Sequence, residues 1–132
     1  MARVIGVGGV FFKSKSGKKL TAWYAKHLGV SVEAWGGAAF PWEEKPASRH
    51  QRFTVWSPFP ADTKHFGSRS DFMLNLIVDD LDAVLKRLRR GKVKPDPKGI
   101  EASEYGRFAW VKDPDGRKLE LWEPPLKPKR KR

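Results

Sequence analysis

The stretch DPDGRKLELWEP, residues 113–124, gives the clearest local indication of structure in this chain. Its first four residues, 113–116, have the composition of a tight hairpin loop, in which proline presets φ and glycine accepts the left-handed conformation. The flanking residues favour extended backbone and predict two strands, Tyr105–Lys112 and Arg117–Trp122. A loop of four residues would place Lys112 opposite Arg117.

That hairpin register predicts which side chains share a face of the sheet, because neighbouring residues of a strand point to opposite faces. It pairs Ala109 with Glu120. One face would carry an apolar group that packs beneath a helix: Phe108, Trp110, Leu119 and Leu121. The opposite face would carry Arg107, Glu120 and Trp122. A shift of one residue at a bulge would exchange the two faces along a strand.

Two segments far apart in the chain show the same order of signals, which predicts an internal repeat. In each, a predicted strand (Arg3–Lys13 and Phe72–Val78) is followed by a helix cap and by apolar residues at helical spacing, and a glycine then ends the helix. The first helix begins after Ser16 and ends at Gly29, with apolar-face positions Leu20, Trp23, Tyr24, His27 and Leu28. The second begins after Asp79-Asp80 and ends at Gly91, with Leu81, Val84, Leu85 and Leu88 on one face.

Further extended segments complete each half. They are Ser31–Trp35, Ala38–Trp42 and Gln51–Trp56 in the first half, and Val93–Pro95 before the hairpin in the second. The order is therefore βαβββ, twice, with residues 57–70 as a Pro-, Gly- and Ser-bearing linker. We expect a first module at 1–62, a second at 63–124, and a basic tail without regular structure at 125–132.

Composition excludes several classes of function. The chain has 132 residues, 39% of them hydrophobic, and no cysteine, which excludes disulfides, thiolate metal sites and a cysteine nucleophile. No apolar run approaches the length of a membrane span and no signal-peptide pattern is present, so we expect a cytoplasmic protein. The net charge of +12 favours anionic partners, although five of the last six residues are basic and account for part of it.

Three stretches together resemble the vicinal oxygen chelate superfamily, which includes glyoxalase I, extradiol dioxygenases and the bleomycin resistance proteins. They are Trp23–Gly29, Val78–Asp82 and the closing residues 113–124. The resemblance implies an α+β fold: two tandem βαβββ modules forming a curled mixed sheet, a cup with the helices outside and a small-molecule ligand inside. It also implies that the protein is a homodimer.

The resemblance further implies where a metal would be held, on the first and last strands of each module. Those positions fall on Gly9, Met73, a residue near Arg52, and Glu120. Only Glu120 is a good ligand for a divalent metal, and a single carboxylate does not hold one. The histidines, His27, His50 and His65, lie outside the strand pattern. We therefore predict no metal and no other cofactor.

Strand alternation gives the candidate residues of the cup. Residues predicted to face inward are Arg52, Thr54, Trp56, Met73, Asn75, Arg107 and Trp122, as ligand-binding residues around Glu120, the one candidate catalytic group. A weakly paired buried carboxylate could act as a general base. The alternative is that Glu120 is neutralised by Arg52 or Arg107 and that the tryptophans are ordinary core.

Three functions remain open. The favoured one is a metal-free protein that binds a small anionic or aromatic molecule in its cup. The second is an enzyme, a lyase, isomerase or dioxygenase, with a relocated metal site or with Glu120 as base. The third is a nucleic-acid partner that uses basic residues at the second helix, namely Lys86, Arg87, Arg89, Arg90, Lys92, Lys94 and Lys98, together with the tail. A solvated helix face explains those residues equally simply and is preferred.

Overall fold

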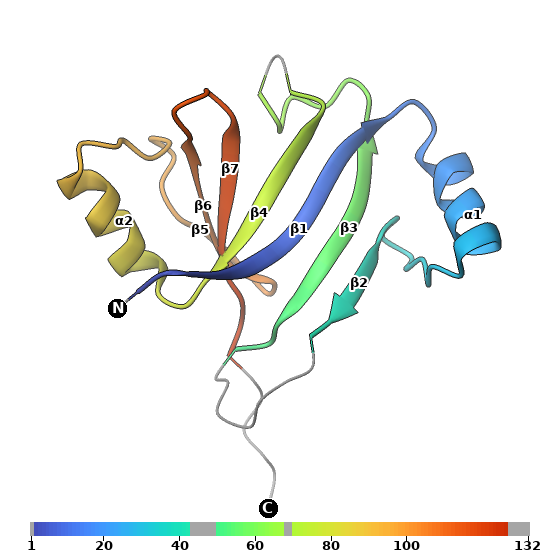
Figure 1. Ribbon diagram of the computed structural model, residues 1–132, viewed down its shortest axis with the longest axis horizontal. Helices are drawn as coiled ribbons and strands as arrows, with labels where there is room; N and C mark the ends of the chain where they lie inside the picture. Colours follow the sequence, from blue (N-terminus) through green and yellow to red (C-terminus); the bar gives the residue numbers. More distant parts are fainter. Residues whose placement is uncertain (1, 43–49, 68–69, 127–132) are drawn as a thin grey trace, which may run out of the picture.

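The computed structural model describes residues 2–42, 50–67 and 70–126. They form one seven-stranded sheet in the order β2-β3-β1-β4-β7-β6-β5, with two helices (Figure 1). The elements are β1 (Val4–Ser14), α1 (Gly17–Leu28), β2 (Ala38–Pro41), β3 (Phe53–Pro60), β4 (Phe72–Val78), α2 (Leu81–Arg90), β5 (Glu101–Ser103), β6 (Gly106–Lys112) and β7 (Lys118–Glu123). Neither helix is long and apolar enough to cross a membrane.

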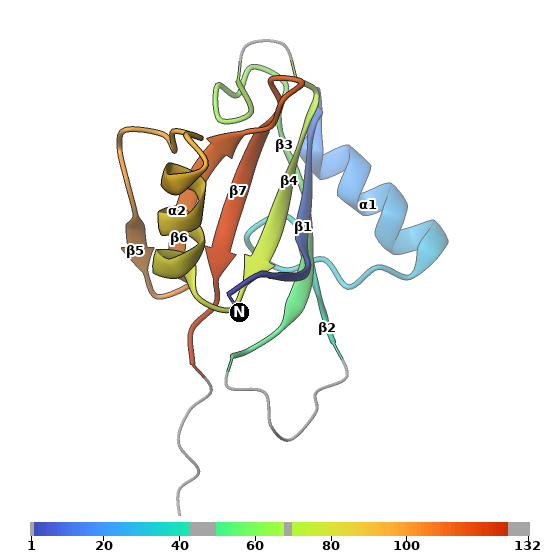
Figure 2. The same ribbon diagram turned by 60° about the vertical axis from the view of Figure 1, so that its left-hand side comes forward.

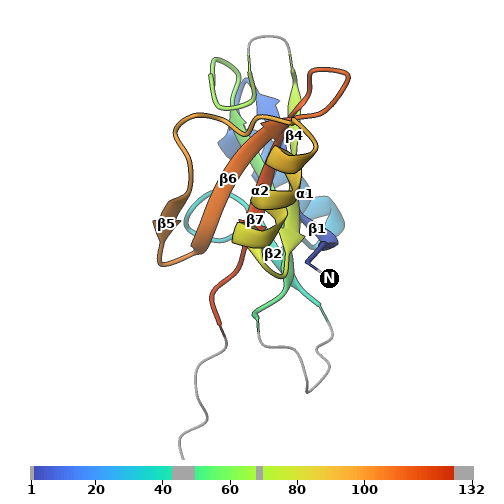
Figure 3. The same cartoon turned by 90° about the vertical axis from the view of Figure 1, so that its left-hand side faces the viewer.

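The sheet is built symmetrically about its centre. Strands β1 and β4 are antiparallel to each other, β3 runs parallel to β1 on one side, and β7 runs parallel to β4 on the other. Turned by 60°, the strands are seen to curl (Figure 2), and β5 and β6 form a hairpin at one edge (Figure 3). The predicted α+β cup is therefore confirmed. The division at residue 62 stays a prediction, and residues 127–132 of the expected tail lie outside the described residues.

Helix α2 forms as its sequence predicts. The Asp80 carboxylate caps the helix by accepting a hydrogen bond from the Ala83 backbone N–H at 3.1 Å. One apolar face is buried against β4, β6 and β7 in a core of Val78, Leu81, Val84, Leu85, Ala109, Val111 and Leu121. Its basic side chains are exposed, which agrees with a solvated helix face.

Helix α1 has the predicted bounds but a different environment. Gly29 ends it in the left-handed conformation, with φ of 69°. Of its residues only Thr21 is buried, while Trp23 and Leu28 are 52% and 62% exposed. The apolar face predicted for α1 therefore remains largely in solvent, and the helix contacts the sheet mainly at β3.

Two predicted extended segments and the start of the linker are wrong. Ser31–Trp35 and Val93–Pro95 are not strands, and β5 lies instead at Glu101–Ser103. The expected linker begins later, because β3 continues through Pro58 to Pro60. Those prolines lie beyond the last residue paired with β2, where that edge of β3 needs no N–H donor.

The register of the β6–β7 hairpin is also wrong by one residue. Lys112 pairs with Lys118 and Trp110 with Glu120, where we expected Arg117 and Leu119. The loop is longer than four residues: the Asp113 N–H bonds the Arg117 carbonyl, and the Asp113 carboxylate accepts from the backbone N–H of residues 115 and 117. The additional loop residue is Arg117, and Gly116 adopts the expected left-handed conformation, with φ of 83°.

Candidate functional site

The concave face of the sheet encloses a cavity of about 660 Å³. It extends from β2 and β3 across β1 and β4 to β7, β6 and β5, so both edges of the curled sheet contribute to it. Lining residues are largely aromatic or small: Gly8, Phe11, Trp35, Ala39, Phe53, Val55, Phe59, His65, Asn75, Glu101, Ala102, Ser103, Tyr105, Phe108, Trp110, Glu120 and Trp122. We call this space the cup.

Aromatic rings form most of its wall and hold one another in place. Phe108 stacks on Trp122 with ring centroids 5.9 Å apart, and Phe53 meets Trp122 edge-on at 5.1 Å. The Trp122 indole N–H donates to the Tyr105 carbonyl at 2.7 Å, which fixes the ring. At the mouth, Trp35 and Tyr105 are 54% and 64% exposed. Such a wall offers large flat area for a planar ligand.

Glu120 lies within the cup with a nearly buried side chain, and three hydrogen-bond partners surround its carboxylate. The Asn75 amide donates to Oε1 at 2.7 Å, and the Trp110 indole N–H donates to Oε2 at 2.9 Å. His65 Nε2 lies 3.1 Å from the same Oε2. Hydrogen bonds to a carboxylate are stronger than those between neutral groups, so this network fixes the position of the Glu120 side chain.

Of the three partners of Glu120, His65 is the least firmly held. Its contact with Glu120 is the longest, it belongs to the loop between β3 and β4, and its side chain is 32% exposed. The ring stacks on Phe59 with an interplanar angle of 4° and meets Trp110 edge-on. His65 is therefore more accessible than Glu120, whose side chain is 7% exposed.

Two ammonium groups lie over Trp110. Lys98 Nζ is 3.8 Å and Lys118 Nζ is 5.7 Å from the ring centroid. Lys118 also donates to the His65 carbonyl at 2.8 Å. Partial burial lowers the pKa of Lys118, and the nearby charge of Lys98 lowers it further. Neither lysine lines the cup, so their positive charges reach a ligand there only as a longer-range field.

The register shows which residues occupy the positions where the resemblance implies a metal. Gly9 pairs with Val55 and with Asn75, and Asn75 pairs with Glu120, so these four form one row across β3, β1, β4 and β7. The row holds Val55 and Asn75 where we had placed Arg52 and Met73. Its only anionic ligand is Glu120, whose two oxygens already accept hydrogen bonds, so the row does not fit a divalent metal. In the described part of the chain, no three His, Cys, Asp or Glu side chains gather as metal ligands.

The structure brings together only part of the predicted site. Asn75, Glu120 and Trp122 line the cup. Met73 faces the same side but is fully buried beneath it, packed with Phe11, Phe66 and Trp110. The remaining four predicted residues, Arg52, Thr54, Trp56 and Arg107, do not line the cup.

On β3 the predicted faces are exchanged. Phe53 and Val55 line the cup, whereas Trp56 packs against Tyr24 of α1 with ring centroids 4.7 Å apart. The Thr54 hydroxyl accepts from the Trp42 indole and donates to the Val7 carbonyl. Arg52 precedes the strand, and its Nε is buried without a hydrogen-bond partner in the described residues. The prediction that Arg52, Thr54 and Trp56 face the cup is therefore wrong.

Arg107 lies on the outer face as a consequence of the register shift. Its guanidinium donates to both carboxylate oxygens of Asp82 at 2.8 and 3.1 Å and lies 3.5 Å from Glu123. This hydrogen bonding raises the pKa of Arg107 and lowers the pKa of Asp82. Arg107 therefore connects α2 to the sheet and does not neutralise Glu120.

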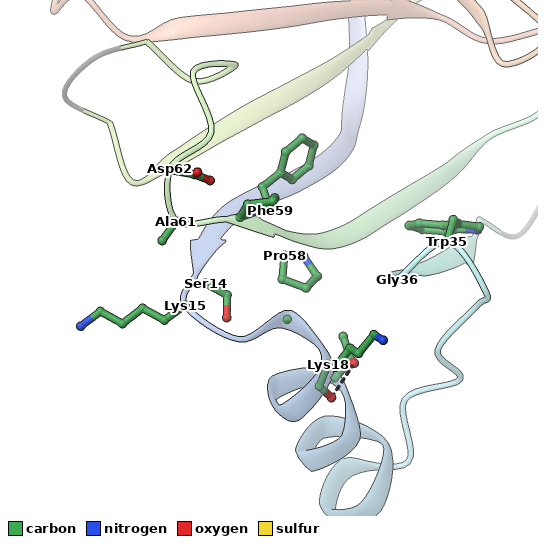
Figure 4. A pocket seen from close by; sticks show the side chains of 12 residues that line it. Ser14, Lys15, Lys18, Trp35, Gly36, Pro58, Phe59, Ala61 and Asp62 are labelled. Atoms are coloured by element: carbon green, nitrogen blue, oxygen red, sulfur yellow. Dashed lines mark hydrogen bonds between the residues drawn. The ribbon is translucent and has the colours of Figure 1, made fainter.

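A second cavity of about 590 Å³ adjoins the cup and shares Trp35 and Phe59 with it (Figure 4). Its charged side chains, Lys15, Lys18 and Asp62, are all exposed. Thr21 is buried but already donates to the Lys18 carbonyl at 3.2 Å. The cup is the better candidate site, because it alone of the two contains a buried carboxylate.

Comparison with known proteins supports the fold. No family model and no curated protein matches the chain. Among solved structures, methylmalonyl-CoA epimerase from Mycobacterium tuberculosis is 22% identical over 92% of this chain and 89% of its own, with a TM-score of 0.58. The Streptomyces coelicolor epimerase in complex with 2-nitronate-propionyl-CoA is 11% identical, covers 92% of this chain and 99% of its own, and has a TM-score of 0.66.

A 2,3-dioxygenase from Pseudomonas sp. KL28 is also similar, with 17% identity, a TM-score of 0.57, and coverage of 94% of this chain but 42% of its own. A glyoxalase/bleomycin resistance protein/dioxygenase superfamily member from Vibrio splendidus covers 93% of this chain and 99% of its own, at 12% identity and a TM-score of 0.54. The sequence resemblance and these structures agree: the chain has the fold of the vicinal oxygen chelate superfamily.

Proposed function

We propose that the protein binds a small aromatic molecule carrying an anionic group, and that it does so in the cup. The observation that carries this proposal is an aromatic cavity of about 660 Å³ whose lining includes one buried carboxylate, Glu120. Few polar groups in an apolar wall are typical of sites that orient a small ligand. Lys98 and Lys118 do not line the cup, but the field of their ammonium groups, which lie over the Trp110 ring, favours an anionic substituent.

Three further points concern the kind of partner, the catalytic alternative and the remaining predictions. The related Streptomyces structure holds 2-nitronate-propionyl-CoA, which supports a small molecule as the partner. An enzyme that uses Glu120 itself as general base has less support, because three partners already engage its oxygens. The homodimer implied by the resemblance and the nucleic-acid alternative remain predictions.

Isothermal titration calorimetry with three small probes tests the proposal. Benzoate presents an aromatic ring and an anion, cyclohexanecarboxylate lacks the aromatic ring, and benzylamine reverses the charge. We expect benzoate to bind most tightly. Phe108→Ala should weaken benzoate binding about tenfold, since it removes a stacked wall ring.

The matched control is Phe72→Ala, because Phe72 is a 46% exposed phenylalanine of β4 that does not line the cup. It should leave benzoate affinity within a factor of about two. Tighter binding of benzylamine than of benzoate would contradict the anionic class. Equal losses in the two phenylalanine variants would place the binding site elsewhere.

A further inference from the structure

The contact between His65 and Glu120 determines which nitrogen of the His65 ring carries the proton. His65 Nε2 lies 3.1 Å from Glu120 Oε2, and the other two partners of the carboxylate, Asn75 and Trp110, are both buried donors. Glu120 is therefore held as a fixed acceptor. In the neutral imidazole this acceptor assigns the proton to Nε2, which leaves a lone pair on Nδ1.

That second nitrogen is open. Among the described residues, His65 Nδ1 has no hydrogen-bond partner, although the ring lines the cup. The ring orientation is nevertheless fixed, by Phe59 on one face and by Trp110 edge-on. Its backbone is held as well, since the N–H donates to the Thr63 hydroxyl and the carbonyl accepts from Lys118. An oriented imidazole with one engaged and one open nitrogen is the arrangement of a general base.

We propose that His65 transfers a proton to and from a carbonyl-containing aromatic ligand bound in the cup, with Glu120 as its positioning residue. This inference rests on the proposed function. His65 Nδ1 takes a proton from the carbon next to the carbonyl, and the electron pair of that C–H bond remains on the ligand as an enolate. Nδ1 then returns a proton to the ligand carbon or oxygen. Because the His65 side chain is 32% exposed, that proton exchanges with solvent, and in D₂O a deuteron is returned; no oxidant or reductant is required.

The charges around His65 favour both charged species of this step, the imidazolium of His65 and the enolate of the ligand. The Glu120 carboxylate stabilises the imidazolium that forms when Nδ1 accepts the proton. The ammonium groups of Lys98 and Lys118 lie over Trp110, the ring that His65 meets edge-on. They do not line the cup, and they favour negative charge on the ligand through their longer-range field. Glu101, which lies 3.8 Å from Lys98, is largely exposed and weakens this field only in part.

The test follows exchange of the methylene protons of phenylpyruvate in D₂O by proton NMR. We expect the protein to accelerate exchange at least about tenfold over buffer, because positioned acid–base groups contribute at least that much. His65→Gln should lose this acceleration at saturating phenylpyruvate, whatever its effect on affinity. Glu120→Gln should reduce it, and His27→Gln, a change on the exposed helix α1, should not.

A second readout does not depend on turnover. The nitrogen-15 shifts of the neutral His65 ring should show a protonated Nε2 and an unprotonated Nδ1, and they should lose that preference in Glu120→Gln. Benzoate binding without accelerated exchange, or equal exchange in His65→Gln and the parent protein, would overturn the proposal while the binding function stands. The opposite tautomer would overturn it too. Absence of benzoate binding would instead count against the proposed function.

Discussion

Glu120→Ala is expected to lower the free energy of unfolding by about 2–4 kcal/mol, because it leaves two buried donors without an acceptor. These are the Asn75 amide and the Trp110 indole N–H, whose residues are 1% and 3% exposed. Urea denaturation followed by far-ultraviolet circular dichroism measures the difference.

The matched control for this loss is Glu101→Ala. Glu101 also lines the cup, but its side chain is 59% exposed and its ion pair with Lys98 spans 3.8 Å. Its removal should change the free energy of unfolding by less than about 0.5 kcal/mol. If Glu120→Ala were no more costly than Glu101→Ala, the hydrogen-bond network described around Glu120 would not exist in solution.

Gly106→Ala should destabilise the protein at least as much as Glu120→Ala, lowering the free energy of unfolding by about 3 kcal/mol or more. Gly106 begins β6 with φ of 117°, and a Cβ built there would lie 2.4 Å from the Glu123 carbonyl oxygen, a backbone atom that cannot move aside. The same Cβ would lie 3.0 Å from the Trp122 indole nitrogen, so the change should also disturb the cup wall.

Gly116→Ala separates backbone strain from the steric clash. Gly116 also has positive φ, 83°, but nothing lies within 4 Å of its added Cβ. Its substitution should therefore cost only about 1 kcal/mol, the cost of the left-handed conformation alone. Equal losses for the two variants in thermal or urea unfolding would show that the packing of Gly106 against β7 is wrong.

Local signals in the sequence predicted the elements that depend on local physics. The Asp80 cap, the apolar face of α2 and the C-terminal Gly29 and Gly91 are short-range features, and both helices have the predicted bounds within a residue or two. The orientation of β4 was also predictable, since Met73 and Asn75 alternate with residues that face α2.

Side-chain orientation on β3 and β6 was not predictable, for a physical reason. Both faces of β3 are apolar or aromatic, with Phe53 and Val55 on one and Trp56 on the other, so alternation does not identify the buried face. On β6, the one additional loop residue, Arg117, shifted the register, so that Phe108 and Trp110 face the cup and Arg107 does not.

His65 was missed because its role depends on a long-range contact. It lies in a loop and is 55 residues from Glu120 in sequence, so neither periodicity nor spacing connects the two. The one local signal was its neighbour Phe66: an apolar residue inside a polar loop, it is 1% exposed and holds this loop against Phe11 and Met73. A buried anchor of this kind indicates that adjacent side chains are also positioned.

The most direct test of the central claim, that the cup is the binding site, uses the indole N–H signals of the six tryptophans in a nitrogen-15 correlation spectrum. Each signal is assigned by a single Trp→Phe substitution, and benzoate is then added. The predicted result is movement of the Trp35, Trp110 and Trp122 signals, which belong to residues lining the cup, with Trp23 and Trp56 unchanged. Movement confined to Trp23 and Trp56, with Trp110 and Trp122 unchanged at saturating benzoate, would contradict the account.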